Sequence, residues 1–137
     1  MLKFINKLFG SKSDRDIKAV KPLVDKIKEE YEKLSSISHD DLRAKTLSFK
    51  EKITEALAAI DTQIADIKGN VESNPNMPLH EKTAAYDEVD KLEKDRNKQL
   101  EAILLEILPE AFAVMKDTAR RFTENEIIEV TASSFDR

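Results

Sequence analysis

The hydrophobic residues between positions 17 and 34 recur at helical spacing and predict an amphipathic first helix. Successive apolar positions lie alternately three and four residues apart, which places them on one helix face. These positions are Ile17, Val20, Val24, Ile27, Tyr31 and Leu34. Ser13 is a suitable N-cap before Asp14. Pro22 lies inside the pattern, so we expect the helix to kink or split near Lys21.

Two longer amphipathic stretches follow, and they predict an antiparallel, coiled-coil-like helical hairpin. The first stretch should begin at a capping box of Ser38 and Asp41 and end near Gly69. The second should begin between Pro78 and Glu81, after a proline-containing loop. The apolar seams consist of Leu42, Phe49, Ile53, Ala56, Leu57, Ile60, Ile64 and Ile67 on the first stretch and Tyr86, Val89, Leu92, Leu100, Ile103, Leu104 and Ile107 on the second.

The last part of the chain predicts a further helix and a short strand. Pro109 suits the first turn of a helix and Glu110 its positive end, so we expect the helix to restart at Pro109. Its apolar stripe consists of Ala111, Phe112, Met115, Ala119 and Phe122. Residues 127–131 predict a C-terminal strand, which needs a partner strand or is otherwise a disordered tail. The expected fold class is therefore all-α.

Composition supports a helical chain and excludes several classes of site. The 137 residues are enough for one ordinary domain, and the charged fraction of 36% favours long helices with solvated faces. The absence of cysteine excludes disulfides and thiolate metal sites, and two histidines exclude a histidine-rich one. A net charge of −4 argues against nucleic-acid binding. No apolar run is long enough to span a membrane, and Lys7 interrupts the start too early for a signal peptide.

Candidate catalytic chemistry is sparse. The two glycines, Gly10 and Gly69, cannot build a phosphate-binding loop, so we expect no nucleotide site in this chain. His39 and His80 lie outside any triad motif, and we expect both to be exposed. We therefore expect no catalytic residue, cofactor-binding residue or metal ligand.

Two clusters of charge leave alternatives open. Asp40 and Asp41 could gather a divalent ion, but no calcium-loop spacing supports this, so a solvated helix face is favoured. Arg120 and Arg121 could meet phosphate or acidic residues, and we favour instead cations that complement the C-terminus of a helix.

The first nine residues combine apolar side chains at helical spacing with positive charge and no acid. Such a basic amphipathic helix can lie in the interface of an anionic membrane, or it can pack on its own protein. The residues alone leave both options open. The candidate membrane-binding or channel-binding residues are Leu2, Lys3, Phe4, Ile5, Lys7, Leu8, Phe9 and Lys12.

Three stretches together resemble the amino-terminal part of the SecA-type protein-translocation ATPases. Residues 8–15 (LFGSKSDR) follow the amphipathic start. Residues 34–46 are similar to the family element LS-(D/E)-(E/D)-L-(R/K)-x-K-T. Residues 108–114 (LPEAFAV), followed by Ala-Arg-Arg, are the most specific. The resemblance covers roughly residues 1–53 and 104–122, so the hairpin over residues 56–103 is interpreted as a lineage-specific insertion. By Arg137 the family's F-D-V-Q and TGEGKT motifs have not appeared.

The resemblance implies a full-length parent that is an ATP-driven motor, which pushes unfolded preproteins through the SecY channel. The parent would use ATP and Mg²⁺, whereas this segment lacks the phosphate-binding loop and should be inactive alone. The implied location is the cytoplasm with peripheral association to the bacterial inner membrane. Implied partners are the SecY channel complex, acidic phospholipids and preproteins, with a homodimer also allowed and no nucleic acid.

The same resemblance implies a division of the chain. Residues 1–12 would be the amphipathic, membrane- or channel-proximal terminus. Residues 13–137 would be one helical region at the edge of the first nucleotide-binding domain. The alternative function is a stand-alone helical-hairpin module for protein interaction.

Overall fold

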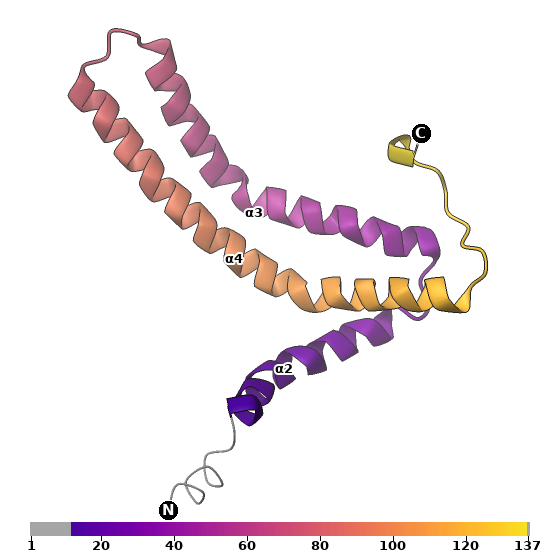
Figure 1. Cartoon of the computed structure of the whole chain (residues 1–137). Coiled ribbons are helices and arrows are strands. Elements are labelled where there is room, and N and C mark those ends of the chain that lie inside the picture. The colour runs from indigo at the N-terminus through magenta and orange to yellow at the C-terminus, as the bar shows by residue number, and fades with distance from the viewer. Residues whose placement is uncertain (1–11, 137) are drawn as a thin grey trace, which may run out of the picture. The chain divides into compact units, whose positions relative to one another are not determined.

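The structure is a computed structural model that describes residues 12–136. Its elements are α2 (Lys12–Lys33), α3 (His39–Ser73), α4 (Leu79–Glu124) and the short 3-10 helix η1 (Ser134–Asp136) (Figure 1). No strand occurs in this part of the chain. The expected all-α class is confirmed.

The chain divides into two units. The hairpin unit is Ala44–Ile107, and the base unit combines the residues up to Arg43 with those from Leu108 onward. Helices α3 and α4 each contribute to both units.

Helix α2 is one helix with Pro22 inside it, so the chain is not split there. Proline has no N–H to donate to the carbonyl four residues earlier, and that carbonyl then needs another partner. No residue of α2 is buried, so water can donate a hydrogen bond to that carbonyl. The kink at Pro22 stays a prediction.

Helix α3 begins at the expected capping box. Ser38 Oγ accepts the N–H of Asp41 at 3.0 Å and donates to Asp41 Oδ2 at 2.7 Å. The predicted end near Gly69 is wrong, because α3 continues to Ser73. A glycine inside a helix destabilises it by about 1 kcal/mol. The extra turn leaves Val71 only 7% exposed. Burial of this side chain contributes about 1.5 kcal/mol or more, which offsets the cost of the glycine.

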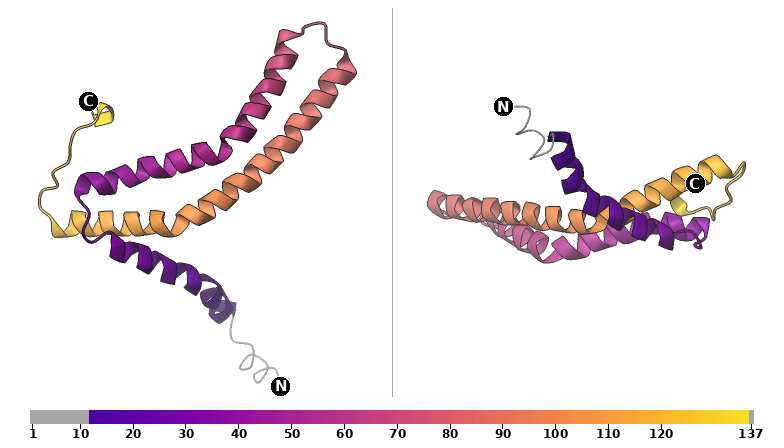
Figure 2. Two further views of the ribbon diagram at one scale, coloured as in Figure 1. Left: turned by 180° about the vertical axis from the view of Figure 1, so that it is seen from behind. Right: turned by 90° about the horizontal axis from the view of Figure 1, so that it is seen from below.

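The hairpin unit has its own apolar core, and the predicted hairpin is confirmed. Leu57, Ile60, Ile64 and Val89 are buried together, and four partly buried residues pack against them: Ile53, Ile67, Leu92 and Leu100. Helices α3 and α4 run side by side on either side of the loop that joins them (Figures 1 and 2). Eight residues of the seams predicted from helical periodicity therefore lie in this core. Tyr86 and Leu104, which were also assigned to the second seam, are instead 48% and 44% exposed.

Helix α4 begins at Leu79, within the expected range, but it does not restart at Pro109 as predicted. It runs without a break to Glu124 with Pro109 inside it. The lost backbone hydrogen bond costs about 3 kcal/mol. Pro109 itself is buried, as are Ile107, Ala113 and Val114 around it, and this packing holds the helix together through the proline.

Residues 127–131 form no strand; between Asn125 and Ser133 the chain has no helix or strand. After α4 the chain continues without regular secondary structure and ends in η1 (Figure 1). The predicted strand needed a neighbouring strand, and the described chain supplies only helices.

Candidate functional site

The residues predicted to bind a membrane or channel lie at the amino terminus. Seven of the eight fall outside the described residues, namely Leu2, Lys3, Phe4, Ile5, Lys7, Leu8 and Phe9. The eighth, Lys12, is the exposed first residue of α2. The structure therefore leaves their proposed role as a prediction.

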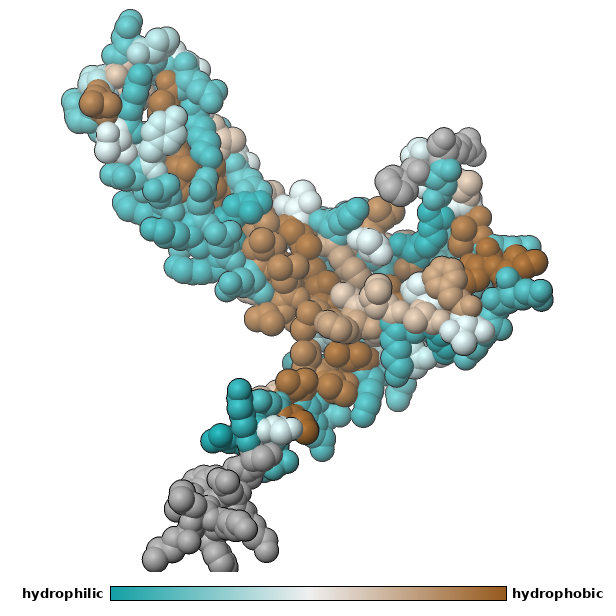
Figure 3. Space-filling view, viewed as in Figure 1, coloured by the Kyte–Doolittle hydropathy of each residue, from teal (hydrophilic) through white to brown (hydrophobic). Residues whose placement is uncertain are grey.

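Helix α2 carries an apolar stripe that is uncovered at its amino-terminal end. Ile17 is 62% exposed and Val20 is 51% exposed, whereas Leu34, which ends the stripe just after α2, is buried. A hollow of about 680 Å³ lies along this end of the helix, lined by Ile17, Val20 and Val24 together with lysines and aspartates. Figure 3 shows the apolar side chains gathered along α2.

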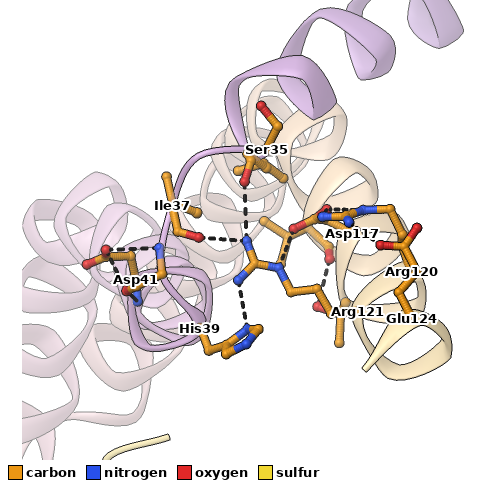
Figure 4. A network of polar contacts seen from close by, with 12 residues as sticks. Ser35, Ile37, His39, Asp41, Asp117, Arg120, Arg121 and Glu124 are labelled. Atoms are coloured by element: carbon orange, nitrogen blue, oxygen red, sulfur yellow. Dashed lines mark hydrogen bonds and ion pairs between the residues drawn. The ribbon is translucent and has the colours of Figure 1, made fainter. Parts of the chain in front are cut away.

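Arg121 is the centre of a polar joint in the base unit. Its Nη2 donates to the carbonyl oxygens of Leu34 at 3.2 Å and Ile37 at 2.9 Å, in the turn between α2 and α3. Its Nη1 lies 2.9 Å from Nδ1 of His39, and its Nε donates to Asp117 Oδ2 at 2.8 Å. Figure 4 shows the guanidinium between the turn and Asp117. Three of these contacts tie α4 to the α2–α3 turn and the first residue of α3, and the fourth holds the guanidinium against Asp117 of α4 itself.

Asp117 is buried beneath this joint at 1% exposure, and both of its oxygens are paired. Oδ2 accepts from Arg121, while Oδ1 accepts from Nε and Nη2 of Arg120 at 3.0 and 2.7 Å. Arg120 also pairs with Glu124, and the two carboxylates raise the pKa of the Arg120 guanidinium. A buried carboxylate held by two arginines is a structural ion pair with no free oxygen for a substrate.

The joint corrects two expectations from the sequence. His39 is half-buried against Arg121 rather than exposed. Since a guanidinium only donates, Nδ1 is the acceptor and the ring proton lies on Nε2. Arg121 is buried at 6% exposure and pairs with Asp117, so the structure supports the alternative in which these arginines meet acidic residues. The spacing of Asp117 to two arginines three and four residues later was the available signal. His80, in contrast, is exposed as expected.

Asp40 and Asp41, at the start of α3, have different structural roles. Asp41 completes the capping box, while Asp40 accepts hydrogen bonds from Thr131. Across residues 12–136 no three His, Asp or Glu side chains are grouped to hold a metal ion.

The apolar stripe predicted after Pro109 lies on the outer side of α4. Phe112, Met115 and Phe122 are 55%, 70% and 69% exposed. The opposite side carries the buried Ala113, Val114, Asp117 and Arg121. Three large apolar side chains on one helix face are typical of an interaction surface.

These features define a helical scaffold region whose buried polar groups hold the fold together. None of the helices in residues 12–136 is long and apolar enough to cross a membrane. The family model described as the SecA DEAD-like domain matches residues 5–132. The chain belongs to the SecA family.

Curated relatives are similar along nearly the whole chain. The protein translocase subunit SecA of Cytophaga hutchinsonii is 46% identical over 136 residues, which are 99% of this chain and 12% of that protein. The same subunit of Parabacteroides distasonis is 46% identical over 134 residues, 98% of this chain and 12% of that protein. The chain therefore spans about 12% of the length of these relatives. No solved structure matches.

The similarity also extends through the hairpin. A match over 136 residues that covers 99% of the chain includes residues 56–103, so the Cytophaga hutchinsonii protein has a counterpart of this segment. That the hairpin is an insertion relative to other members of the family stays a prediction.

Proposed function

We propose that this chain is part of an ATP-driven translocation motor that moves unfolded preproteins through the SecY channel. The observation that carries the proposal is the 46% identity, along 99% of the chain, to a protein translocase subunit SecA. In the proposed whole protein, ATP and Mg²⁺ bind in sequence outside this chain, because its two glycines cannot build a phosphate-binding loop. The segment itself performs no catalysis.

Its first proposed role is attachment to the inner membrane and the channel complex. Residues 1–12 would supply this role, with an apolar face for the acyl boundary and lysines for acidic headgroups. The apolar face consists of Leu2, Phe4, Ile5, Leu8 and Phe9, and the cations are Lys3, Lys7 and Lys12. The uncovered stripe of Ile17 and Val20 directly follows these residues and would extend the apolar contact.

Its second proposed role is to brace the motor at the edge of the first nucleotide-binding domain. The hydrogen bonds of Arg121 hold the α2–α3 turn against α4. The base unit would therefore serve as a rigid support. The exposed face of Phe112, Met115 and Phe122 would pack against the rest of the motor. The hairpin over residues 56–103 would be an inserted element within this helical region of residues 13–137.

The reading frame beyond codon 137 separates this proposal from a stand-alone hairpin module. The motor requires a D-V-Q element and a G-x-x-x-x-G-K-T loop within about the next hundred codons, because the loop cradles the phosphates. Their presence, together with ATP hydrolysis by the longer product and none by residues 1–137, supports the proposal. An open reading frame that lacks both motifs contradicts it and favours the module.

A further inference from the structure

Asp40 holds Thr131 of the carboxyl-terminal segment by two hydrogen bonds. Its Oδ1 accepts the main-chain N–H of Thr131 at 2.9 Å, and its Oδ2 accepts the Thr131 hydroxyl at 2.6 Å. One carboxylate therefore satisfies the amide and the side chain of the same residue.

Arg43, one turn further along α3, completes the contact from the other side. Its Nη1 donates to the main-chain oxygen of Thr131 at 3.2 Å, and its Nη2 donates to both oxygens of Asp136 at 2.9 and 2.8 Å. Asp136 also accepts from the main-chain N–H and the hydroxyl of Ser133, each at 2.8 Å. Asp40 and Arg43 thus contact both backbone polar groups of Thr131 and the carboxylate of Asp136, which lies five positions later.

The first turn of α3, which carries Asp40, is also held by contacts that do not involve the carboxyl-terminal segment. Ser38 and Asp41 fix the first turn of α3 through the capping box. Arg121 fixes the same turn through His39. Side chains on an already ordered turn lose little conformational freedom on binding, which raises affinity for a given set of contacts.

We propose that Asp40 and Arg43 form a clamp for an open peptide segment, and that residues 131–136 fill it as a displaceable strap. The recognised features are the main chain and hydroxyl of a threonine or serine and a carboxylate five residues after it. The contacts are polar and lie at the surface, so the strap exchanges with solvent-exposed states. This binding site is independent of the proposed translocation role.

Chain connectivity sets the affinity that the clamp needs. Helix α4 ends at Glu124, so a short linker delivers Thr131 at an effective concentration of roughly a few mM. A strap that is closed for about nine-tenths of the time then requires a dissociation constant of roughly 0.5 mM or below for the same peptide added in trans.

Amide exchange and peptide binding test the clamp on the whole 137-residue chain. In the unmodified chain the Thr131 amide should exchange at least tenfold more slowly than an unstructured amide. Arg43→Gln and Asp40→Ala should each abolish this protection. Lys50→Gln removes the same charge from an exposed position of α3 and should leave the protection intact. An unprotected Thr131 in the unmodified chain, or equal protection in the Arg43→Gln and Lys50→Gln variants, overturns the proposal.

The trans arm uses a labelled peptide that copies residues 127–136. It should bind the Thr131→Ala/Asp136→Asn double variant, whose own strap is weakened, at sub-millimolar concentration. Its binding to the unmodified chain should be about tenfold weaker, because the strap competes. Addition of Arg43→Gln to the double variant should abolish binding, with unchanged helix content by circular dichroism. Binding that ignores Arg43, or that is equal in the unmodified chain and the double variant, contradicts the clamp.

Discussion

The guanidinium of Arg121 donates a 2.9 Å hydrogen bond to the carbonyl oxygen of Ile37, which lies 84 positions earlier in the chain. The same nitrogen reaches the carbonyl of Leu34, and the neighbouring nitrogens engage His39 and Asp117. A turn that joins two helices leaves carbonyls without helical partners. Arg121 supplies a donor from α4 to Ile37 and a second donor to Leu34, whose carbonyl also accepts the main-chain N–H of Ile37. One side chain of α4 thus helps to hold the turn.

Replacement of Arg121 by leucine should destabilise the base unit strongly. The change leaves Asp117 buried without one of its two arginines and removes one donor from each of the Leu34 and Ile37 carbonyls. Breaking a buried pair costs about 3–5 kcal/mol. Urea unfolding followed by circular dichroism measures the loss. Arg96→Leu is the matched control, because Arg96 pairs with Asp61 at the surface of the hairpin and should cost little. Equal losses in the two variants would contradict the importance of the joint.

Truncation of Leu57 should destabilise the hairpin unit. Leu57 is 2% exposed in the core, so Leu57→Ala should cost about 2–5 kcal/mol through lost burial and a cavity. Leu47 is 60% exposed on the same helix, and Leu47→Ala should change stability by less than about 0.5 kcal/mol. Urea midpoints of the two variants compare them directly. A Leu47 effect as large as that of Leu57 would show that the apolar seam is assigned to the wrong face.

Acid should open the strap. The hydrogen bond and charge of Arg43 lower the pKa of Asp136 from 3.8 to about 2, and the hydrogen bonds from Thr131 lower the pKa of Asp40. Because both pKa values are lower in the closed strap, closure is fully favoured above about pH 4 and is lost as the pH falls towards about 2. His39 and Arg43 are the other titratable groups that face this contact.

The chemical shift of the Thr131 amide reports this opening during titration from pH 7 to pH 2. Asp136→Asn should reduce the acid transition, because the variant lacks one of the two carboxylates. Helix content measured in parallel distinguishes opening of the strap from unfolding. A shift that changes between pH 5 and pH 7 would contradict an origin in the two carboxylates.

The exposed face of α4 should bind a hydrophobic dye. Phe112, Met115 and Phe122 are each more than half exposed, so the triple substitution to serine should lower ANS fluorescence several-fold without loss of helix. A comparable triple serine change at buried positions would unfold the chain instead. Unchanged fluorescence in the exposed-face variant would show that this face is covered in solution.

Helical periodicity was sufficient to predict the hairpin, because its seams depend only on local spacing. Val89 and Leu57 occupy the core that their spacing indicated. The two expected helix boundaries at Gly69 and Pro109 were wrong for a shared reason. Local propensity favoured a break at each, and burial of Val71 near Gly69 and of Ala113 near Pro109 outweighed it.

The long-range polar contacts could not be predicted, because they join residues far apart in the sequence. Arg121 and His39 are 82 positions apart, and Asp40 and Thr131 are 91 positions apart. For both the Arg121–His39 and the Asp40–Thr131 contacts, the charge pattern along one helix is equally consistent with a solvated helix face. Only the chain topology brings the first turn of α3 beside the end of α4, where these side chains meet.

Co-sedimentation with anionic vesicles tests the proposed attachment most directly. The 137-residue chain should pellet with vesicles that contain acidic phospholipid, and the chain without residues 1–10 should not. Lys3→Gln/Lys7→Gln should weaken binding, whereas Lys50→Gln/Lys52→Gln removes the same charge from exposed positions of α3 and should not. Binding should also fall from about 0.01 M to about 1 M salt, since the screening length shortens from about 30 Å to about 3 Å. Equal binding by the full and shortened chains would contradict attachment through the amino terminus.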